Sequence, residues 1–273
     1  MSETGETAGT LFKAGRLNEA VAAAGAAVRA APADLSARIF LAELLLFAGN
    51  FERADVVLDA ASVIEPEAAI VVAEFRQLLR AATARRQVHS DGRLPEFLDE
   101  PTPALAAILE AHVALRAGDA ATAAAMAGRA EELRPRIDGR AGTRRFDDFR
   151  DASDLNSGFF EVLTTTGKYF WIPAERVMSV EFHKPLRARD LFWRRASMSV
   201  RQGPDGDVYL PVIYETTDPA SPDTLRLGRA TEWVERGAGL VLGAGQASFL
   251  AGDDLVSIMD LTTLDFGAGA GAP

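Results

Sequence analysis

The residues that could do chemistry gather most densely in one short segment near the middle of the chain. It reads RRFDDFRDASD, from Arg144 to Asp154, and holds four carboxylates within eight residues. Carboxylate oxygens bind divalent cations, so one hypothesis is a metal-dependent enzyme that uses Asp147, Asp148 or Asp151. The segment lacks the glycine turn and the final glutamate of an EF-hand loop. We favour ion pairing at a domain junction, where the arginines of the segment neutralise these acids: Arg144, Arg145 and Arg150.

Histidine, cysteine and glycine patterns give no sign of a cofactor site. The chain has no cysteine, and its three histidines, His89, His112 and His183, have no ligand spacing between them. We interpret each histidine as a surface or helix residue, and we expect no metal and no cofactor. The glycine-rich stretch from Gly237 to Gly245 has no Gly-Lys-Ser/Thr after it and no βαβ pattern around it. It therefore predicts a turn or a bulged strand.

One basic segment contains aromatic residues and reads RARDLFWRR, from Arg187 to Arg195. Taken alone, this mixture is typical of single-stranded nucleic-acid binding. The whole chain, however, has 39 acidic and 29 basic residues and a formal net charge of -10. Such a charge repels nucleic acid and anionic membranes. We therefore expect Trp193 to pack inside the protein and the arginines to meet carboxylates or a partner protein.

The length and composition of the chain indicate what kind of fold positions these residues. The 273 residues are 48% hydrophobic and 25% charged, enough for two domains of about 100–200 residues each with a real core. Residues 1–10 are polar and acidic, with no pattern of a secretory signal. The apolar stretch from Ile39 to Phe47 is interrupted by Glu43 and falls short of the roughly 18 residues that span a bilayer. We expect a soluble, cytoplasmic protein without nucleic-acid or membrane partners.

The first half contains an internal repeat. Three segments align without gaps, and each begins with Ala-Gly and ends with Pro: Ala14 to Pro32, Ala48 to Pro66, and Ala117 to Pro135. The first two start 34 residues apart, which is the period of the tetratricopeptide (TPR) helix-turn-helix, and the third starts 69 residues later. An alanine-rich helical bundle is the alternative. Residues 67–86 predict one more helix, and residues 87–103 a connection.

The repeated residue types have physical roles in such a unit. The glycines Gly15, Gly49 and Gly118 stand where the first helix of each pair ends, and glycine tolerates the left-handed conformation found there. Ala20 and Ala54 are small residues at the place where paired helices cross closely. The proline at the end of each repeat prevents the second helix from continuing.

The second half has the residue composition of a β domain. From about Asp138, glycine, aromatic and β-branched residues predict strands at 159–163, 169–172, 177–182, 197–201 and 207–214. Turn-forming residues at 166–168 and 203–206 indicate two hairpins. The predicted fold class is α+β. A TPR-like helical repeat domain covers 1–137, a mixed, largely β domain with one or two short helices covers 138–266, and a flexible tail covers 267–273.

Six motifs follow one another in the order in which a known family carries them. They are PADLSARIFLAELLLFAGNFERAD (32–55), FDDFRDASDL (146–155), GKYFWIP (167–173), RARDLFWRRA (187–196), GPDGDVYLPVIY (203–214) and LGRATEW (227–233). On these motifs the chain resembles the ImpE/TagJ (SciE-type) family, accessory proteins of bacterial type VI secretion systems associated with virulence. Two positions depart from the family: Ser153 stands where the family has an acidic residue, and Glu232 where it has Asp. The first departure makes a metal role of the acidic segment less credible.

The resemblance implies a cytoplasmic adaptor rather than an enzyme. Members of the family bind the small subunit of the contractile sheath through a helix near the N-terminus of that subunit. They are also linked to the AAA+ unfoldase that recycles contracted sheath. The resemblance thus implies two partners, the small sheath subunit and the unfoldase.

Helical repeats commonly bind a partner helix in the concave groove lined by the first helix of each pair. Their positions within the 34-residue unit predict the groove-facing residues to be Phe12, Ile39, Phe40, Glu43, Leu46 and Phe47. We predict that this mostly apolar groove, edged by Glu43, receives an amphipathic sheath helix. Ordinary core packing is the alternative for each of these side chains.

Overall fold

The first half of the protein is built from helices that pair as the repeat predicts. The structure is a computed structural model and describes residues 6–64 and 69–267. The helices of this half are α1 (Ala8–Lys13), α2 (Leu17–Ala30), α3 (Leu35–Phe47), α4 (Phe51–Ile64), α5 (Ala69–Ser90), α6 (Pro103–Arg116) and α7 (Ala120–Leu133). Pro66 of the second repeat and the tail beyond residue 267 lie outside the described residues.

The helix ends confirm the roles assigned to the repeated residues. Gly15, Gly49 and Gly118 follow α1, α3 and α6, with φ angles of 81°, 72° and 79°. A side chain at these φ angles would be strained, so the three glycines allow the tight turn into the next helix. Ala20 and Ala54 are both fully buried, at 0% exposure, where α2 and α4 cross their neighbours.

Helix α5 is longer at its C-terminal end than predicted. It runs from Ala69 to Ser90, so residues 87–90, predicted as connection, form its last turn. The remaining connection is ordered by the sheet: the backbone N–H of Glu96 donates to the oxygen of Tyr169, and the N–H of Trp171 donates to the oxygen of Glu96. The predicted connection is thus partly helix and partly a short edge of the sheet.

The second half is composed of strands with four short helical turns in the described residues. An eight-stranded antiparallel sheet has the order β2-β1-β13-β6-β7-β8-β4-β5. Its strands are β1 (Gly139–Ala141), β2 (Arg144–Phe146), β4 (Phe159–Leu163), β5 (Tyr169–Pro173), β6 (Val177–Phe182), β7 (Trp193–Val200), β8 (Asp205–Pro211) and β13 (Thr263–Phe266). The two predicted hairpins are confirmed as β4–β5 and β7–β8.

Two smaller sheets complete this half. A three-stranded sheet has the order β12-β11-β3, and a hairpin joins β9 and β10. Their strands are β3 (Phe149–Asp151), β9 (Thr231–Glu235), β10 (Val241–Gly245), β11 (Ser248–Ala251) and β12 (Asp254–Ser257). The short turns are η2 (Asp154–Asn156), η3 (Ala174–Arg176), η4 (Ala188–Leu191) and α8 (Asp223–Arg226). The glycine-rich stretch forms the β9–β10 turn and strand, as predicted.

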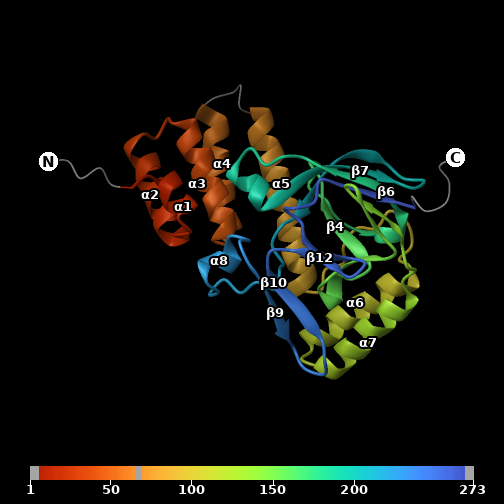
Figure 1. The fold of residues 1–273 in the computed structure, drawn as a ribbon. Coiled ribbons are helices and arrows are strands. Elements are labelled where there is room, and N and C mark those ends of the chain that lie inside the picture. Colours follow the sequence, from red (N-terminus) through yellow and green to blue (C-terminus); the bar gives the residue numbers. More distant parts are fainter. Residues whose placement is uncertain (1–5, 65–68, 268–273) are drawn as a thin grey trace.

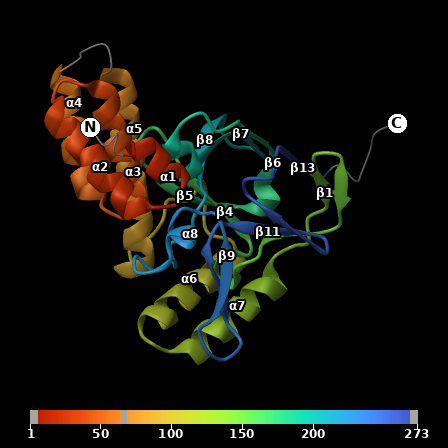
Figure 2. The same ribbon diagram turned by 60° about the vertical axis from the view of Figure 1, so that its left-hand side comes forward.

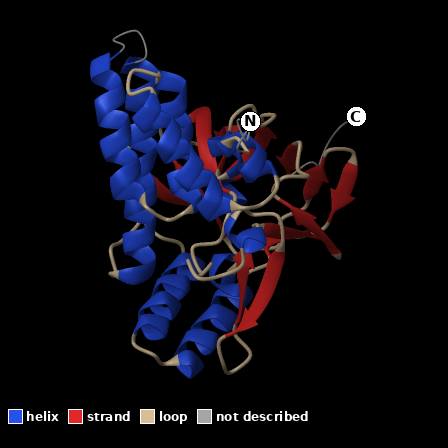
Figure 3. Cartoon of the chain, turned by 90° about the vertical axis from the view of Figure 1, so that its left-hand side faces the viewer, coloured by secondary structure: helices blue, strands red, loops and turns tan. Residues whose placement is uncertain are grey.

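The parts are arranged around α5. Figure 1 shows α1–α4 on one side, the strands on the other, and α5 between them, while α6 and α7 lie below the strands. In the turned view the N-terminal helices come in front of α5, and α6 and α7 still lie below the strands (Figure 2). Figure 3 shows most of the helices gathered on one side and at one end of the strands. One hydrophobic core runs from α1–α5 into the eight-stranded sheet, and a smaller cluster lies between α6, α7 and β10. The fold is α+β, as predicted.

Candidate functional site

The structure brings together the six residues predicted to line the groove. All of them lie on α1 and α3, and the ring of Phe12 meets those of Phe40 and Phe47 at centroid distances of 6.2 and 5.3 Å. Four are buried, and only Ile39 and Phe40 are partly exposed. The buried four are Phe12, Glu43, Leu46 and Phe47.

The second half of the chain covers this face of α3. The turn η4 packs on α3, and the ring of Phe192, which follows η4, lies 5.2 Å from Phe47 and 6.1 Å from Phe51. At the end of α1, the guanidinium of Arg229 donates to the backbone oxygens of Phe12 and Lys13 at 2.6 and 3.0 Å. The concave face is therefore occupied by the chain itself around Phe47.

Glu43 lies beneath η4 and does not edge an open groove. Both Glu43 and Arg189 of η4 are 4% exposed. Burial raises the pKa of Glu43 to about 7, although the nearby Arg189 guanidinium acts in the opposite direction. Arg189 lies over the ring of Phe75, 4.8 Å from its centroid. Glu43 and Arg189 thus interact electrostatically where η4 covers α3, without a salt bridge, and the repeat pattern gave no means to predict this contact.

A second buried ionic network joins α5 to the strands. Arg85 donates to both carboxylate oxygens of Glu161 on β4, at 2.7 and 2.8 Å, and to Glu215 at 2.9 Å. The hydroxyl of Tyr169 donates to Glu161, and the indole N–H of Trp171 donates to Tyr169 at 2.6 Å. The Arg85 charge holds the pKa of Glu161 well below its ordinary value despite burial. This network links α5 to the sheet through buried side chains.

The structure places two histidines beside this network. The rings of His89 on α5 and His112 on α6 lie 5.0 Å apart, and His112 lies 5.2 Å from Trp171. Burial, with a contribution from His89, lowers the pKa of His112 to about 3, so its ring is neutral near pH 7. Sequence spacing could not reveal this pair because the two residues lie on different helices. His183 follows β6 and its Nε2 lies 2.9 Å from the Ser197 hydroxyl.

The acids of the 144–154 segment do not converge on one point. Asp148 binds Arg134 at 2.6 Å, and Asp154 binds Arg150 at 3.0 Å. Asp151 is buried, which raises its pKa to about 7, and it accepts from the Tyr214 hydroxyl at 2.8 Å. Asp147 is exposed. In the described part of the chain, no group of three or more His, Asp or Glu side chains is placed to hold a metal ion.

Ion pairing at this junction differs in detail from the prediction. Arg150 pairs with Asp154 within the segment, as expected. Arg144, on the edge strand β2 of the large sheet, instead pairs with Asp254 of β12 at 2.6 Å. The cation that neutralises Asp148 is Arg134, which comes from the end of α7.

The basic segment 187–195 packs largely as predicted. Trp193 is 2% exposed, and Arg195 pairs with Asp207 at 2.6 Å. Arg194 is buried but meets the ring of Phe182 and the backbone oxygen of Met259. The segment is thus mainly a contact between the two halves, with some of its cations facing a cavity.

Comparisons with known proteins identify the family. The model of the ImpE protein family matches residues 143–265, and a tetratricopeptide repeat model matches residues 11–81. The chain is 30% identical over 256 residues to the type VI secretion system accessory component TagJ of Pseudomonas aeruginosa, covering 94% of this chain and 89% of that protein. The chain belongs to the ImpE/TagJ family of type VI secretion accessory proteins.

A solved structure has a fold similar to that of this chain. The crystal structure of protein VPA1032 from Vibrio parahaemolyticus matches with a TM-score of 0.89 at 27% identity, over 95% of this chain and 97% of that one. The arrangement of the two halves in this chain is therefore similar to that in VPA1032. No helix within residues 6–64 and 69–267 has the length and apolar character needed to cross a membrane.

Proposed function

We propose that this ImpE/TagJ family member is a cytoplasmic adaptor that binds the small subunit of the contractile sheath through a helix near the N-terminus of that subunit. In the same proposal, the bound adaptor assists the AAA+ unfoldase that recycles contracted sheath. The type VI accessory role comes from the family, and the repeats that match the TPR model are a common means of binding a partner helix.

The choice of α3 as the docking surface rests on one observation. Of the six residues predicted to contact the partner, Ile39 and Phe40 in the first half of α3 are partly exposed, whereas the others are packed within the chain. An amphipathic helix that docks here would bury Ile39 and Phe40 and follow α3 up to the point where η4 begins to cover it. The proposed contact is therefore shorter than a groove that runs the full length of α3.

The proposal is tested by calorimetric titration of the full chain with a peptide of the N-terminal helix of the small sheath subunit. We expect saturable binding by the native protein. Ile39→Asp removes an apolar contact and places a charge in it, and burial of one large apolar side chain is worth about 1.5–3 kcal/mol, so the affinity should fall about 10- to 100-fold.

The matched control is Val56→Asp. Val56 lies on the neighbouring helix α4, is 68% exposed, and undergoes the same change of charge and size class. Circular dichroism and thermal melting should show both variants folded. Equal affinities of Ile39→Asp and the native protein would reject the α3 surface, and absence of binding by the native protein would reject the sheath helix as the partner.

The role with the unfoldase has its own readout. Contracted sheath, unfoldase and ATP are mixed with the native protein or with Ile39→Asp, and sheath disassembly is followed by light scattering. The native protein should change the disassembly rate and the variant should not. A rate that the native protein leaves unchanged would contradict assistance to the unfoldase while leaving sheath binding intact.

A further inference from the structure

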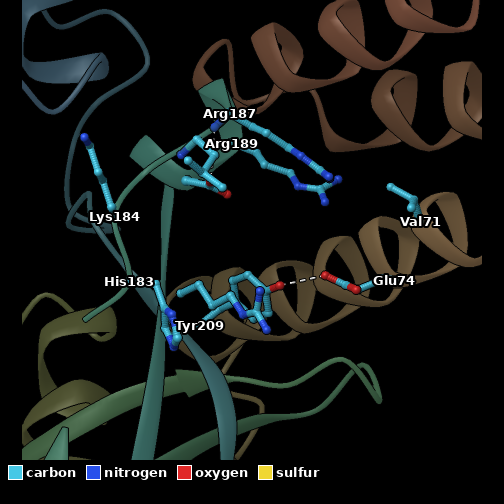
Figure 4. Close-up of a pocket in the computed structure, with 10 residues that line it drawn as sticks. Val71, Glu74, His183, Lys184, Arg187, Arg189 and Tyr209 are labelled. Atoms are coloured by element: carbon cyan, nitrogen blue, oxygen red, sulfur yellow. Dashed lines mark hydrogen bonds between the residues drawn. The ribbon is translucent and has the colours of Figure 1, made fainter. Parts of the chain in front are cut away.

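A cavity of about 370 Å³ lies between α5, η4 and the strands β7 and β8. Figure 4 shows Arg187 and Arg189 entering from η4, Val71 and Glu74 from α5, and His183 and Tyr209 from the strand side. Six charged side chains besides the histidine line it: Glu74, Lys184, Arg187, Arg189, Asp190 and Arg195. Four cations against two carboxylates leave the lining positive by two charges, in a chain whose formal net charge is -10.

The acids of the cavity are already engaged. Glu74 accepts a hydrogen bond from the Tyr209 hydroxyl at 2.6 Å, drawn as the dashed line in Figure 4. Asp190 accepts from the backbone N–H groups of Leu186 and Arg187 at 2.8 and 3.0 Å, which closes the start of η4. The two carboxylates therefore shape the walls of the cavity and form no salt bridge with its cations, although Glu74 and the buried Glu43 beneath η4 act electrostatically on Arg189.

Three of the four cations of the cavity form no salt bridge within the described residues. Arg195 pairs with Asp207 at 2.6 Å. Among the residues that the structure describes, Lys184, Arg187 and Arg189 form no salt bridge. Lys184 and Arg187 are exposed at the mouth of the cavity. The site thus offers two exposed cations at its rim.

Arg189 is the buried member of the set. Only 4% of the residue is exposed, and its Nε and Nη1 have no hydrogen-bond partner within the described residues. A buried guanidinium without full hydrogen bonding is costly, and burial together with the nearby Arg187 lowers its pKa. An anion in the adjacent cavity would offset this cost because its charge attracts all the cations at once.

We propose that this cavity binds a phosphate group, either as inorganic phosphate or on a phosphorylated small molecule, with Arg189 as the buried anchor and Arg187 and Lys184 at the rim. A guanidinium presents N–H donors in a planar fork that fits phosphate oxygens. A carboxylate ligand would offer only two acceptor oxygens and one negative charge to the three arginines and the lysine of the cavity, whereas a phosphate offers more of both. The volume falls within the range of about 300–1,000 Å³ typical of small-molecule sites. This site goes beyond the proposed sheath contact and does not depend on it.

The test is calorimetric titration of the full chain with inorganic phosphate, pyrophosphate and ATP, each against sodium chloride at matched ionic strength. We expect saturable binding by at least one of them. Arg187→Glu reverses one exposed charge at the rim and should weaken binding at least about tenfold. The matched control, Arg145→Glu, reverses an exposed arginine on β2 at the far edge of the sheet and should leave the affinity unchanged.

The outcomes separate the sources of the phosphate. Binding of inorganic phosphate shows that the bare ion suffices, whereas binding restricted to pyrophosphate or ATP assigns a polyphosphate-bearing molecule. Arg189→Gln, checked for folding by circular dichroism, should abolish binding altogether. The proposal is overturned if none of the three probes binds saturably up to about 10 mM, a range that includes even weak sites. It is equally overturned if Arg145→Glu weakens binding as much as Arg187→Glu does.

Discussion

The two groups of repeat helices, α1–α4 and α6–α7, share one local signature and differ in how they contact the strands. Each has a positive-φ glycine between its paired helices and an N-cap side chain before the first helix. Asp34 accepts from the N–H of Ala37 before α3, and Thr102 accepts from the N–H of Leu105 before α6. The hairpins themselves are therefore built in the same way.

The contacts with the strand half are of different chemistry. Aromatic rings on the α3–α5 side meet Phe192 and Trp193, and Arg85 forms a buried ionic network with Glu161 and Glu215. Helix α7 instead presents alanines to a small cluster, and Arg134 at its end pairs with Asp148. The comparison teaches that the repeat signature determines a hairpin, whereas residues outside the signature determine where that hairpin docks.

The largest effect is expected from Arg85→Met, which breaks the contact on the α5 side. Methionine keeps the aliphatic part of the arginine side chain, but it leaves the Glu161 carboxylate buried without the guanidinium and leaves Glu215 with Arg86 alone. Removal of one partner from a buried ion pair typically costs about 3–5 kcal/mol. Urea denaturation followed by tryptophan fluorescence should show this loss in the free energy of unfolding. Arg86→Met is the control, since Arg86 is more exposed and reaches Glu215 at 3.3 Å.

Arg134→Met makes the corresponding break on the α7 side. Arg134 binds Asp148, but its other partner, Glu131, has a side chain that is 38% exposed and water can solvate it after the change. We expect a loss of about 1–2 kcal/mol, smaller than for Arg85→Met. An equal or larger loss for Arg134→Met would contradict the claim that the α5 contact dominates.

The next effect concerns pH, because His112 lies where α6 meets α5 and the sheet. Its pKa is about 3 in the folded protein against 6.5 for the ordinary group. The unfolded chain therefore binds the proton first, and stability is lost as the pH falls below about 6.5. Between pH 7 and pH 5 this histidine should reduce the free energy of unfolding by about 2 kcal/mol. His112→Gln should remove that part of the loss, measured by urea denaturation at the two pH values.

Two buried acids change the free energy of unfolding in the opposite direction between pH 7 and pH 5. The quantity to compare is therefore the difference between the His112→Gln variant and the native protein. Burial raises the pKa of Glu43 and of Asp151 to about 7 each. Their folded forms take up protons as the pH falls toward 5, which stabilises the fold. If native protein and His112→Gln change equally between pH 7 and pH 5, His112 is not the acid-sensitive group of this contact.

Features that depend on residues close together in the sequence were predicted correctly. The Ala-Gly turns, the small Ala20 and Ala54, and the hairpin turns at 166–168 and 203–206 depend on neighbours within a few residues. The end of α5 was missed because its last turn has no glycine or proline to stop it before Asp91. Helix ends without such signals are set by packing, which sequence order does not display.

The site was harder to predict because its contacts join residues far apart in the chain. Leu46 and Phe47 have the spacing of groove residues in a repeat, and only the fold shows that Phe192 covers Phe47. Periodicity identifies an apolar face but not what lies on it. The electrostatic contact of Glu43 with Arg189 is likewise absent from any local pattern.

The smallest effect is expected from the N-caps, which both groups of repeat helices share. Asp34→Ala and Thr102→Ala each remove the side-chain acceptor before the first helix of a hairpin, and each should cost about 1 kcal/mol in urea denaturation. Thr102→Ser, which keeps the hydroxyl, should be close to native. The two losses should be similar because a cap acts on its own helix turn and not on the docking contact. A much larger loss for Thr102→Ala would mean that α6 depends on its cap for docking, so that the signature and the docking contact are not independent.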